Sequence, residues 1–370
     1  MMRPVGLYVH IPFCARKCVY CDFPSFSGCE EAMPRYVDRL IGEMAERRDP
    51  DARIATLYIG GGTPSLLPPG LMRRVLSALR ENFSFAPDAE CSCECNPGTV
   101  TEDFLSALRE HGVNRLSMGV QAGQDRLLRL LGRIHTWDQA AESAALARRA
   151  GFRNLNLDLM LGLPTQTLAD VEETLQKAIA LAPTHLSCYG LIVEEGTPLK
   201  DYVDRGLWAL PGEEEERAMY ECCRETLAAH GFQQYEISNF ALPGFACRHN
   251  TDCWQRKEYI GLGCSAAGFL GNERYRNPPA LADYLRGTPA EKTRLSPEEA
   301  RFESVMLGLR LTEGLSEDAF LAMHGMTVDQ AFPGKMDRSI REGLLIWEGG
   351  HLKLTRRGMD LQNRVLVDFL

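Results

Sequence analysis

The chain has 370 residues, with 41 basic and 50 acidic side chains and a formal net charge of −9. A chain this acidic lacks the basic footprint of nucleic-acid-binding proteins, so we expect no nucleic acid among its partners. No apolar run reaches the length of a membrane span and the N-terminus has no signal-peptide core, which predicts a cytoplasmic protein without an integral membrane segment and leaves room for peripheral association. In that compartment the 13 cysteines are expected to be thiols or metal ligands.

Short strand-like runs, each followed by a helical pattern, fill the first part of the chain. The runs cover residues 6–11, 56–61, 90–96, 115–121, 154–161 and 185–191. The helical patterns cover residues 33–48, 70–82, 101–111, 137–150, 168–181 and 213–230. Regular alternation of this kind predicts an α/β protein built from parallel βα units.

Each run has one apolar face and one polar face. In residues 154–161, for example, Asn156 and Asp158 oppose Leu155 and Leu157. Parallel strands buried on both faces read as continuous apolar runs, so these strands need water or a ligand on one side. The pattern favours a partial (β/α)6 TIM-like barrel whose inner face is a binding cavity; a half-solvated sheet in an ordinary α/β protein is the alternative. In such barrels the functional groups lie at the carboxyl ends of the strands.

Cys14, Cys18 and Cys21 follow the first run directly, with the spacing C-x3-C-x2-C. Structural zinc sites use four protein ligands and an iron–sulfur cubane has four iron corners, so three thiolates leave one position open for a cofactor. The alternatives are buried thiols or a zinc site completed by a distant ligand. Three further cysteines alternate on one face of the third run and are expected to pack as small hydrophobic residues: Cys91, Cys93 and Cys95.

The stretch 7–26, LYVHIPFCARKCVYCDFPSF, resembles the signature of the radical S-adenosylmethionine (SAM) superfamily. In that superfamily three cysteines hold a 4Fe–4S cluster and SAM binds the fourth iron. The flanking residues, from Tyr8 to Cys14 and from Cys21 to Phe23, resemble the coproporphyrinogen-III-oxidase-like group, especially its HemW heme-chaperone branch. The resemblance covers nearly the whole chain and agrees with a partial barrel of the radical SAM type.

The resemblance also implies which residues contact SAM. A Gly-rich segment, Gly60-Gly61-Gly62-Thr63-Pro64, ends the second strand. It contains the GGTP motif that contacts the amino group of SAM in the family. Ribose hydroxyls need carboxylate acceptors, and the SAM carboxylate needs a donor such as arginine. The implied contacts are Tyr8, Tyr20, Gly62, Thr63, Glu94, Gln121, Arg133 and Asp158. For each residue taken singly, an ordinary buried polar role is the alternative.

A second family segment is Arg248-His249-Asn250-Thr251-Asp252-Cys253-Trp254, which resembles the HemW pattern H-N-x-x-Y-W. Cys253 stands where the family usually has tyrosine. Imidazole suits heme iron, which makes His249 a candidate axial ligand. The alternative is that His249 only caps a turn.

The last part of the chain reads as a separate unit. Ser296, Pro297 and Glu299 form a helix start with a capping box, and Gly349-Gly350 joins two short strands into a hairpin. Three helices and this hairpin predict a small C-terminal winged-helix-like α+β module, which we interpret as a lid or docking module. The expected division is 1–230 for the barrel, 231–295 for a family-specific extension and linker, and 296–370 for the module.

The sequence is compatible with two functions. The resemblance implies a HemW-like heme chaperone that binds heme, a 4Fe–4S cluster and SAM, receives electrons from a donor, and transfers heme to an acceptor protein. The alternative is an oxygen-independent coproporphyrinogen III oxidase-like radical SAM enzyme of porphyrin biosynthesis. That oxidase has a long N-terminal extension and a fourth cysteine two places after the third, where this chain has Phe23. The sequence leaves open whether the protein is an enzyme.

Overall fold

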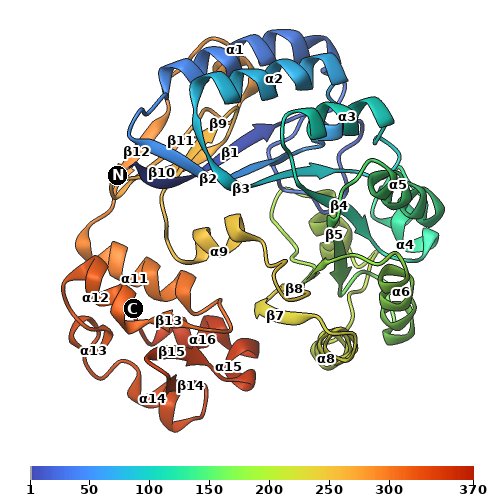
Figure 1. Cartoon of the computed structure of the whole chain (residues 1–370). Coiled ribbons are helices and arrows are strands. Elements are labelled where there is room, and N and C mark those ends of the chain that lie inside the picture. The colour runs from blue at the N-terminus through green and yellow to red at the C-terminus, as the bar shows by residue number, and fades with distance from the viewer. Residues whose placement is uncertain (1) are drawn as a thin grey trace.

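Twelve strands form one continuous sheet in the computed structural model, which describes residues 2–370 (Figure 1). Its centre is a run of six parallel strands in chain order: β1 (Arg3–Ile11), β2 (Ala52–Gly61), β3 (Ser84–Cys95), β4 (Arg115–Gln121), β5 (Asn154–Leu161) and β6 (His185–Gly190). All six predicted strands are confirmed. The first three begin a few residues earlier than predicted because parallel pairing continues into partly exposed segments in which the polar–apolar alternation is lost.

The helices that follow these strands lie on the outside of the sheet (Figure 1). They are α1 (Met33–Glu46), α2 (Pro69–Asn82), α3 (Glu102–Glu110), α4 (Asp125–Leu130), α5 (Trp137–Arg149), α6 (Leu168–Ala180) and α8 (Glu213–Ala229). The short helix α7 (Pro198–Asp204) lies against the cysteine loop, where the amide of Leu199 donates to the carbonyl oxygen of Val19 at 2.9 Å. Capping boxes start two of them, Thr136 with Gln139 at α5 and Thr167 with Asp170 at α6. The short helices α4 and α7 were not predicted, because fewer than three turns give little periodicity to read. No helix in residues 2–370 has the length and apolar content that crossing a membrane requires.

The central strands curve without closing. Strand β1 pairs with β2 and β9, and β6 pairs with β5 and β8, so β1 and β6 do not meet. The remaining strands extend both edges: β7 (Gln233–Glu236) and β8 (Asn239–Ala241) beside β6, and β9 (Tyr259–Leu262), β10 (Ala267–Leu270), β11 (Glu273–Arg276) and β12 (Glu291–Arg294) beside β1. The segment 231–295, which also contains α9 (Arg248–Trp254) and α10 (Leu281–Leu285), therefore continues the barrel sheet.

The two faces of the central strands differ as predicted. Apolar side chains of the outer face form the main core with the helices, and Cys91, Cys93 and Cys95 are buried in that core as expected. The inner face also carries buried polar side chains: Thr56, Ser92, Arg115, Asn156 and His185. Helix α9 lies on this concave side, beneath β2 and β3 in the view of Figure 1, and its His249 hydrogen-bonds Thr56 of β2.

The C-terminal module has its own core and a three-stranded antiparallel sheet, which confirms the predicted winged-helix-like unit. Its elements are α11 (Pro297–Gly308), β13 (Leu315–Ser316), α12 (Glu317–His324), α13 (Val328–Ala331), α14 (Asp337–Arg341), β14 (Leu345–Glu348), β15 (His351–Leu354), α15 (Arg356–Asp360) and α16 (Gln362–Val367). The predicted capping box of Ser296 and Glu299 is present. The module is tied to the barrel by ion pairs such as Arg310 with Glu236 and Arg356 with Glu221.

Candidate functional site

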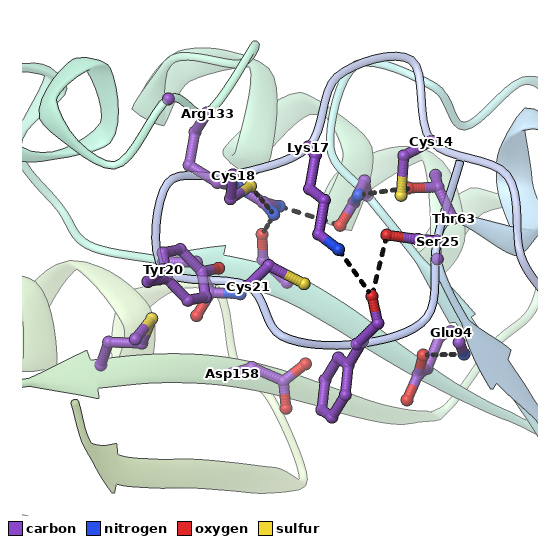
Figure 2. Close-up of a pocket in the computed structure, with 18 of the residues that line it drawn as sticks. Cys14, Lys17, Cys18, Tyr20, Cys21, Ser25, Thr63, Glu94, Arg133 and Asp158 are labelled. Carbon is purple, nitrogen blue, oxygen red and sulfur yellow. Dashed lines mark hydrogen bonds between the residues drawn. The ribbon is translucent and has the colours of Figure 1, made fainter. Parts of the chain in front are cut away.

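A cavity of about 530 Å³ lies at the carboxyl ends of the central strands (Figure 2). This is the size of pocket that holds one small-molecule ligand. Side chains from the loop after β1 and from the ends of the later strands line it, among them Cys14, Cys18, Cys21, Thr63, Glu94, Gln121, Arg133 and Asp158. The candidate functional groups therefore lie at the carboxyl ends of the strands, as is usual in barrels of this type. Within residues 2–370, the lining includes no residue of the C-terminal module, which does not act as a lid in this conformation.

The three motif cysteines all face this cavity and form no disulfide. The hydroxyl of Thr63 donates to Sγ of Cys14 at 3.6 Å, and Nη1 of Arg133 donates to Sγ of Cys18 at 3.6 Å. Figure 2 shows the loop encircling the space between these sulfurs. The two donors can also hydrogen-bond these sulfurs when the cysteines bind metal.

Burial raises the pKa of the Cys21 thiol to about 11. At neutral pH this thiol stays protonated unless a metal displaces the proton, since metal ligands must be deprotonated. Among residues 2–370, no three Cys, His or acidic side chains are grouped closely enough to hold a single metal ion. The donor set fits a 4Fe–4S cluster instead: three thiols around one cavity, with a hydroxyl and a guanidinium directed at two of the sulfurs.

Packing against the cysteine loop requires glycine at the end of β2 and directly after it. A Cβ on Gly61, whose φ is +115°, would lie 2.6 Å from the ring of His10. A Cβ on Gly62 would lie 2.7 Å from the carbonyl oxygen of Phe13 and 3.0 Å from Sγ of Cys14. Real Cβ atoms do not approach other atoms so closely, so only glycine lets the second strand end this near to the cysteine loop.

Two half-buried carboxyls, Glu94 and Asp158, form the floor of the cavity. The carboxylate of Glu94 accepts hydrogen bonds from the Tyr58 hydroxyl and the Gly61 amide, both at 3.0 Å. Burial, together with the nearby Asp158, raises the pKa of Glu94 to about 7. Burial also raises the pKa of Asp158, which accepts from the amide of Asn156 at 2.7 Å. The two carboxyls fit a ligand that brings hydroxyl or ammonium donors.

Arg133 lines another part of the cavity and carries a positive charge, opposite in sign to an ionised carboxyl. Its Nη2 donates to Oδ1 of Asn96 at 2.8 Å, while its buried Nε has no hydrogen-bond partner in the described chain. A buried donor without a partner is uncommon, and a ligand carboxylate would satisfy it. Gln121 lies nearby in the left-handed region at φ 73° and accepts from the Tyr189 hydroxyl at 3.0 Å. Non-glycine residues in that region cluster at ligand sites.

Two of the predicted residues lie outside the cavity lining. Tyr8 hydrogen-bonds His10 at 2.8 Å, and His249 hydrogen-bonds Thr56 at 2.9 Å while its ring stacks on Tyr58. His249 thus lies beneath the cavity floor, where burial lowers its pKa to about 4. The role of Tyr8 in SAM contact and of His249 in heme ligation both stay predictions. Tyr20, in contrast, lines the cavity beside Cys18.

The cavity lining also includes residues that were not singled out, among them Tyr58, Asn96 and Tyr189. The strand period places Tyr58 and Tyr189 on the inner face, so their direction could have been read from the sequence. Their partners could not, because Tyr58 donates to Glu94 and Tyr189 donates to Gln121, residues of different strands. Asn96 bridges Arg133 and Thr63 in the same way.

Comparison with known proteins agrees with this geometry. The pattern of the radical SAM superfamily matches residues 8–178, and that of the HemN C-terminal domain matches residues 295–361. Proteins named heme chaperone HemW are similar over nearly the full length of both chains: 34% identical in Lactococcus lactis (100% of this chain, 98% of the relative), 36% in Bacillus subtilis (98% and 98%) and 36% in Escherichia coli (100% and 99%).

Among solved structures, the fold is similar to coproporphyrinogen III oxidase (HemN) from Escherichia coli, described as a radical SAM enzyme. The TM-score is 0.86 at 25% identity, covering 100% of this chain and 90% of that chain. Members of the superfamily hold a 4Fe–4S cluster and SAM, and the thiols, carboxyls and arginine described above fit both. The chain therefore belongs to the radical SAM superfamily and, within its HemN-like group, to the HemW branch.

Proposed function

We propose that this protein is a heme chaperone, which binds heme and passes it to an acceptor protein while its cavity holds a 4Fe–4S cluster and SAM. The observation that carries the proposal is the full-length similarity to relatives from several bacteria that are all named heme chaperone HemW. Heme, an acceptor protein and an electron donor for the cluster are the partners that the proposal requires. The predicted compartment is the cytoplasm.

The geometry of the cavity supports the residue roles that the family resemblance implies. Cys14, Cys18 and Cys21 would hold the cluster, and Arg133 would bind the carboxylate of SAM. Glu94 and Asp158 would accept hydrogen bonds from hydroxyl or ammonium groups of SAM. Four further residues line the same cavity and would complete the SAM site: Tyr20, Gly62, Thr63 and Gln121. A bound and reduced cluster would supply an electron to SAM, and this chain's own residues would bind, orient and shield the two groups.

Coproporphyrinogen oxidation is the second candidate. The similarity to the HemN structure favours it, since the whole chain superposes on that radical SAM enzyme. The cysteine loop argues against it, because Phe23 stands at the position that the oxidase pattern gives to a fourth cysteine. We therefore rank the chaperone first.

Parallel anaerobic assays would separate the two candidates. The protein is reconstituted with iron and sulfide, reduced with dithionite, and given SAM together with either coproporphyrinogen or heme. We expect saturable heme binding, transfer of that heme to a heme-free globin as a generic acceptor, and unchanged coproporphyrinogen. Protoporphyrinogen detected by chromatography would overturn the chaperone proposal, and absence of heme binding would remove its basis.

A further inference from the structure

Exposed apolar side chains gather at the mouth of the cavity. Three of the exposed large hydrophobic side chains in the described chain line it: Phe23 (61% exposed), Ile134 (51%) and Ile192 (68%). They come from three different segments, the loops after β1, α4 and β6. Scattered exposed apolar residues are normal, but several around one opening mark a binding surface.

The backbone of Phe23 is fixed although its ring is exposed. Its carbonyl oxygen accepts hydrogen bonds from Nζ of Lys17 at 3.1 Å and Oγ of Ser25 at 3.2 Å, and Figure 2 shows both donors reaching this one oxygen. The next carbonyl, of Pro24, is held by the ring of His10 at 2.8 Å. An aromatic ring on a fixed backbone loses little conformational entropy when a ligand covers it. Phe23 is therefore a preorganised docking face.

The mouth of the cavity carries both basic and acidic side chains. Arg16 is exposed and has no hydrogen bond or ion pair within residues 2–370, and it lies next to Lys17 in the cysteine loop. Asp22 and Glu194 also line the mouth and would repel an anion. A ligand with carboxylates would therefore place them at Arg16 and lay its apolar part over Phe23 and Ile192.

The cavity volume limits what can lie inside. About 530 Å³ suits one ligand of nucleoside size, and the inner walls carry the groups that fit SAM. A second, larger ligand must lie across the opening. A planar apolar ring system with carboxylates at one edge matches that opening, and a tetrapyrrole has this chemistry.

We infer that the rim formed by Phe23, Ile134 and Ile192, with Arg16 beside it, is the surface on which the protein binds heme. This inference rests on the proposed function and adds the location to it. Binding here depends on the face of the macrocycle and on its propionates. The described part of the cavity lining contains no histidine and His249 lies beneath the cavity floor, so binding at the rim uses no imidazole ligand from the lining.

Spectroscopic titrations of the cluster-loaded protein test the location with three probes: heme, iron-free protoporphyrin and heme dimethyl ester. We expect wild-type protein to bind heme and protoporphyrin with similar affinity. Phe23→Ser and Ile192→Ser should each weaken the binding of heme and of protoporphyrin by about tenfold, because each variant loses one apolar contact with the ring. Val367→Ser, at a side chain 63% exposed in the C-terminal module, is the matched control and should bind like wild type.

The charge is tested with Arg16→Glu. It should weaken heme binding about threefold and leave binding of the dimethyl ester unchanged, because the ester has no carboxylate to pair. Equal heme affinity in wild type and all rim variants would overturn the inference and leave the proposed function standing, as would a wild-type protein that binds heme but not protoporphyrin. A wild-type protein that binds no heme would refute both. Cluster iron content, measured in each variant, excludes loss of fold as the cause.

Discussion

The ring of His249 stacks on the ring of Tyr58, with centroids 5.3 Å apart and planes inclined by 25°. The hydroxyl of the same Tyr58 donates to Glu94 at 3.0 Å, so α9 is linked through one tyrosine to the floor of the cavity. Helix α9 therefore helps to position a carboxyl that faces the cavity.

Two substitutions of His249 separate its possible roles. His249→Ala removes the ring on which Tyr58 stacks, and we expect about fivefold weaker SAM binding, the size of one aromatic pair. His249→Phe keeps a ring in that place and should restore SAM affinity. If His249 also ligates heme iron, both variants lose heme affinity alike in a heme titration. Heme binding that matches wild type in both variants would eliminate the ligand role.

The cluster assignment is tested by single cysteine changes. Cys14→Ala, Cys18→Ala and Cys21→Ala should each abolish the cluster, because each removes one of only three protein ligands. Iron and sulfide content and the electron paramagnetic resonance spectrum after anaerobic reconstitution report the result. Cys29→Ala is the control, since Cys29 is half-buried in the same loop region and outside the cavity lining. Iron content like wild type in any of the three variants contradicts the assignment.

Glu94 should lower the stability of the ligand-free protein at neutral and alkaline pH. Its pKa is raised from 4.5 to about 7 in the folded state, so folding disfavours the charged form. The folded state loses stability as pH rises from about 4.5 to about 7 and then stays level. Glu94→Gln should therefore raise the free energy of unfolding by on the order of 1–3 kcal/mol at pH 8, with little effect at pH 4.5. Thermal unfolding at both pH values measures this.

The same variant should bind SAM more weakly, since a charged acceptor is lost. Glu81→Gln, at an exposed carboxyl on α2, should change neither property and serves as the control. An unfolding temperature of Glu94→Gln that stays at or below the wild-type value at pH 8 would show that the carboxyl is not strained in the folded protein.

Gly62→Ala should displace the cysteine loop. The added Cβ would overlap the Phe13 carbonyl and crowd Sγ of Cys14, and neither the backbone nor a cluster ligand can yield cheaply. We expect this variant to reconstitute its cluster poorly, which a low iron content would show. Gly70→Ala, at the start of α2 with no atom within 4 Å of the new Cβ, should keep full iron content. Full occupancy in Gly62→Ala would mean that the loop adapts.

The sequence by itself determined the positions of the six strands along the chain, the direction of their polar faces and the position of the cysteine loop after β1. These follow from local rules: a period of two residues in strands, and three thiols within eight residues of one another. The same period placed Glu94, Gln121 and Asp158 toward one interior, because the carboxyl ends of parallel strands meet at one end of a barrel.

Only the tertiary structure decided how the extension and the cavity are related. The strands after residue 231 join both edges of the barrel sheet through pairings with β1 and β6, and no local pattern encodes such distant partners. His249 was predicted from a motif as a ligand, and the fold buries it against Thr56 and Tyr58. The apolar rim likewise exists only because the loops holding Phe23, Ile134 and Ile192 converge on one opening, and which exposed side chains converge is a property of the packed barrel.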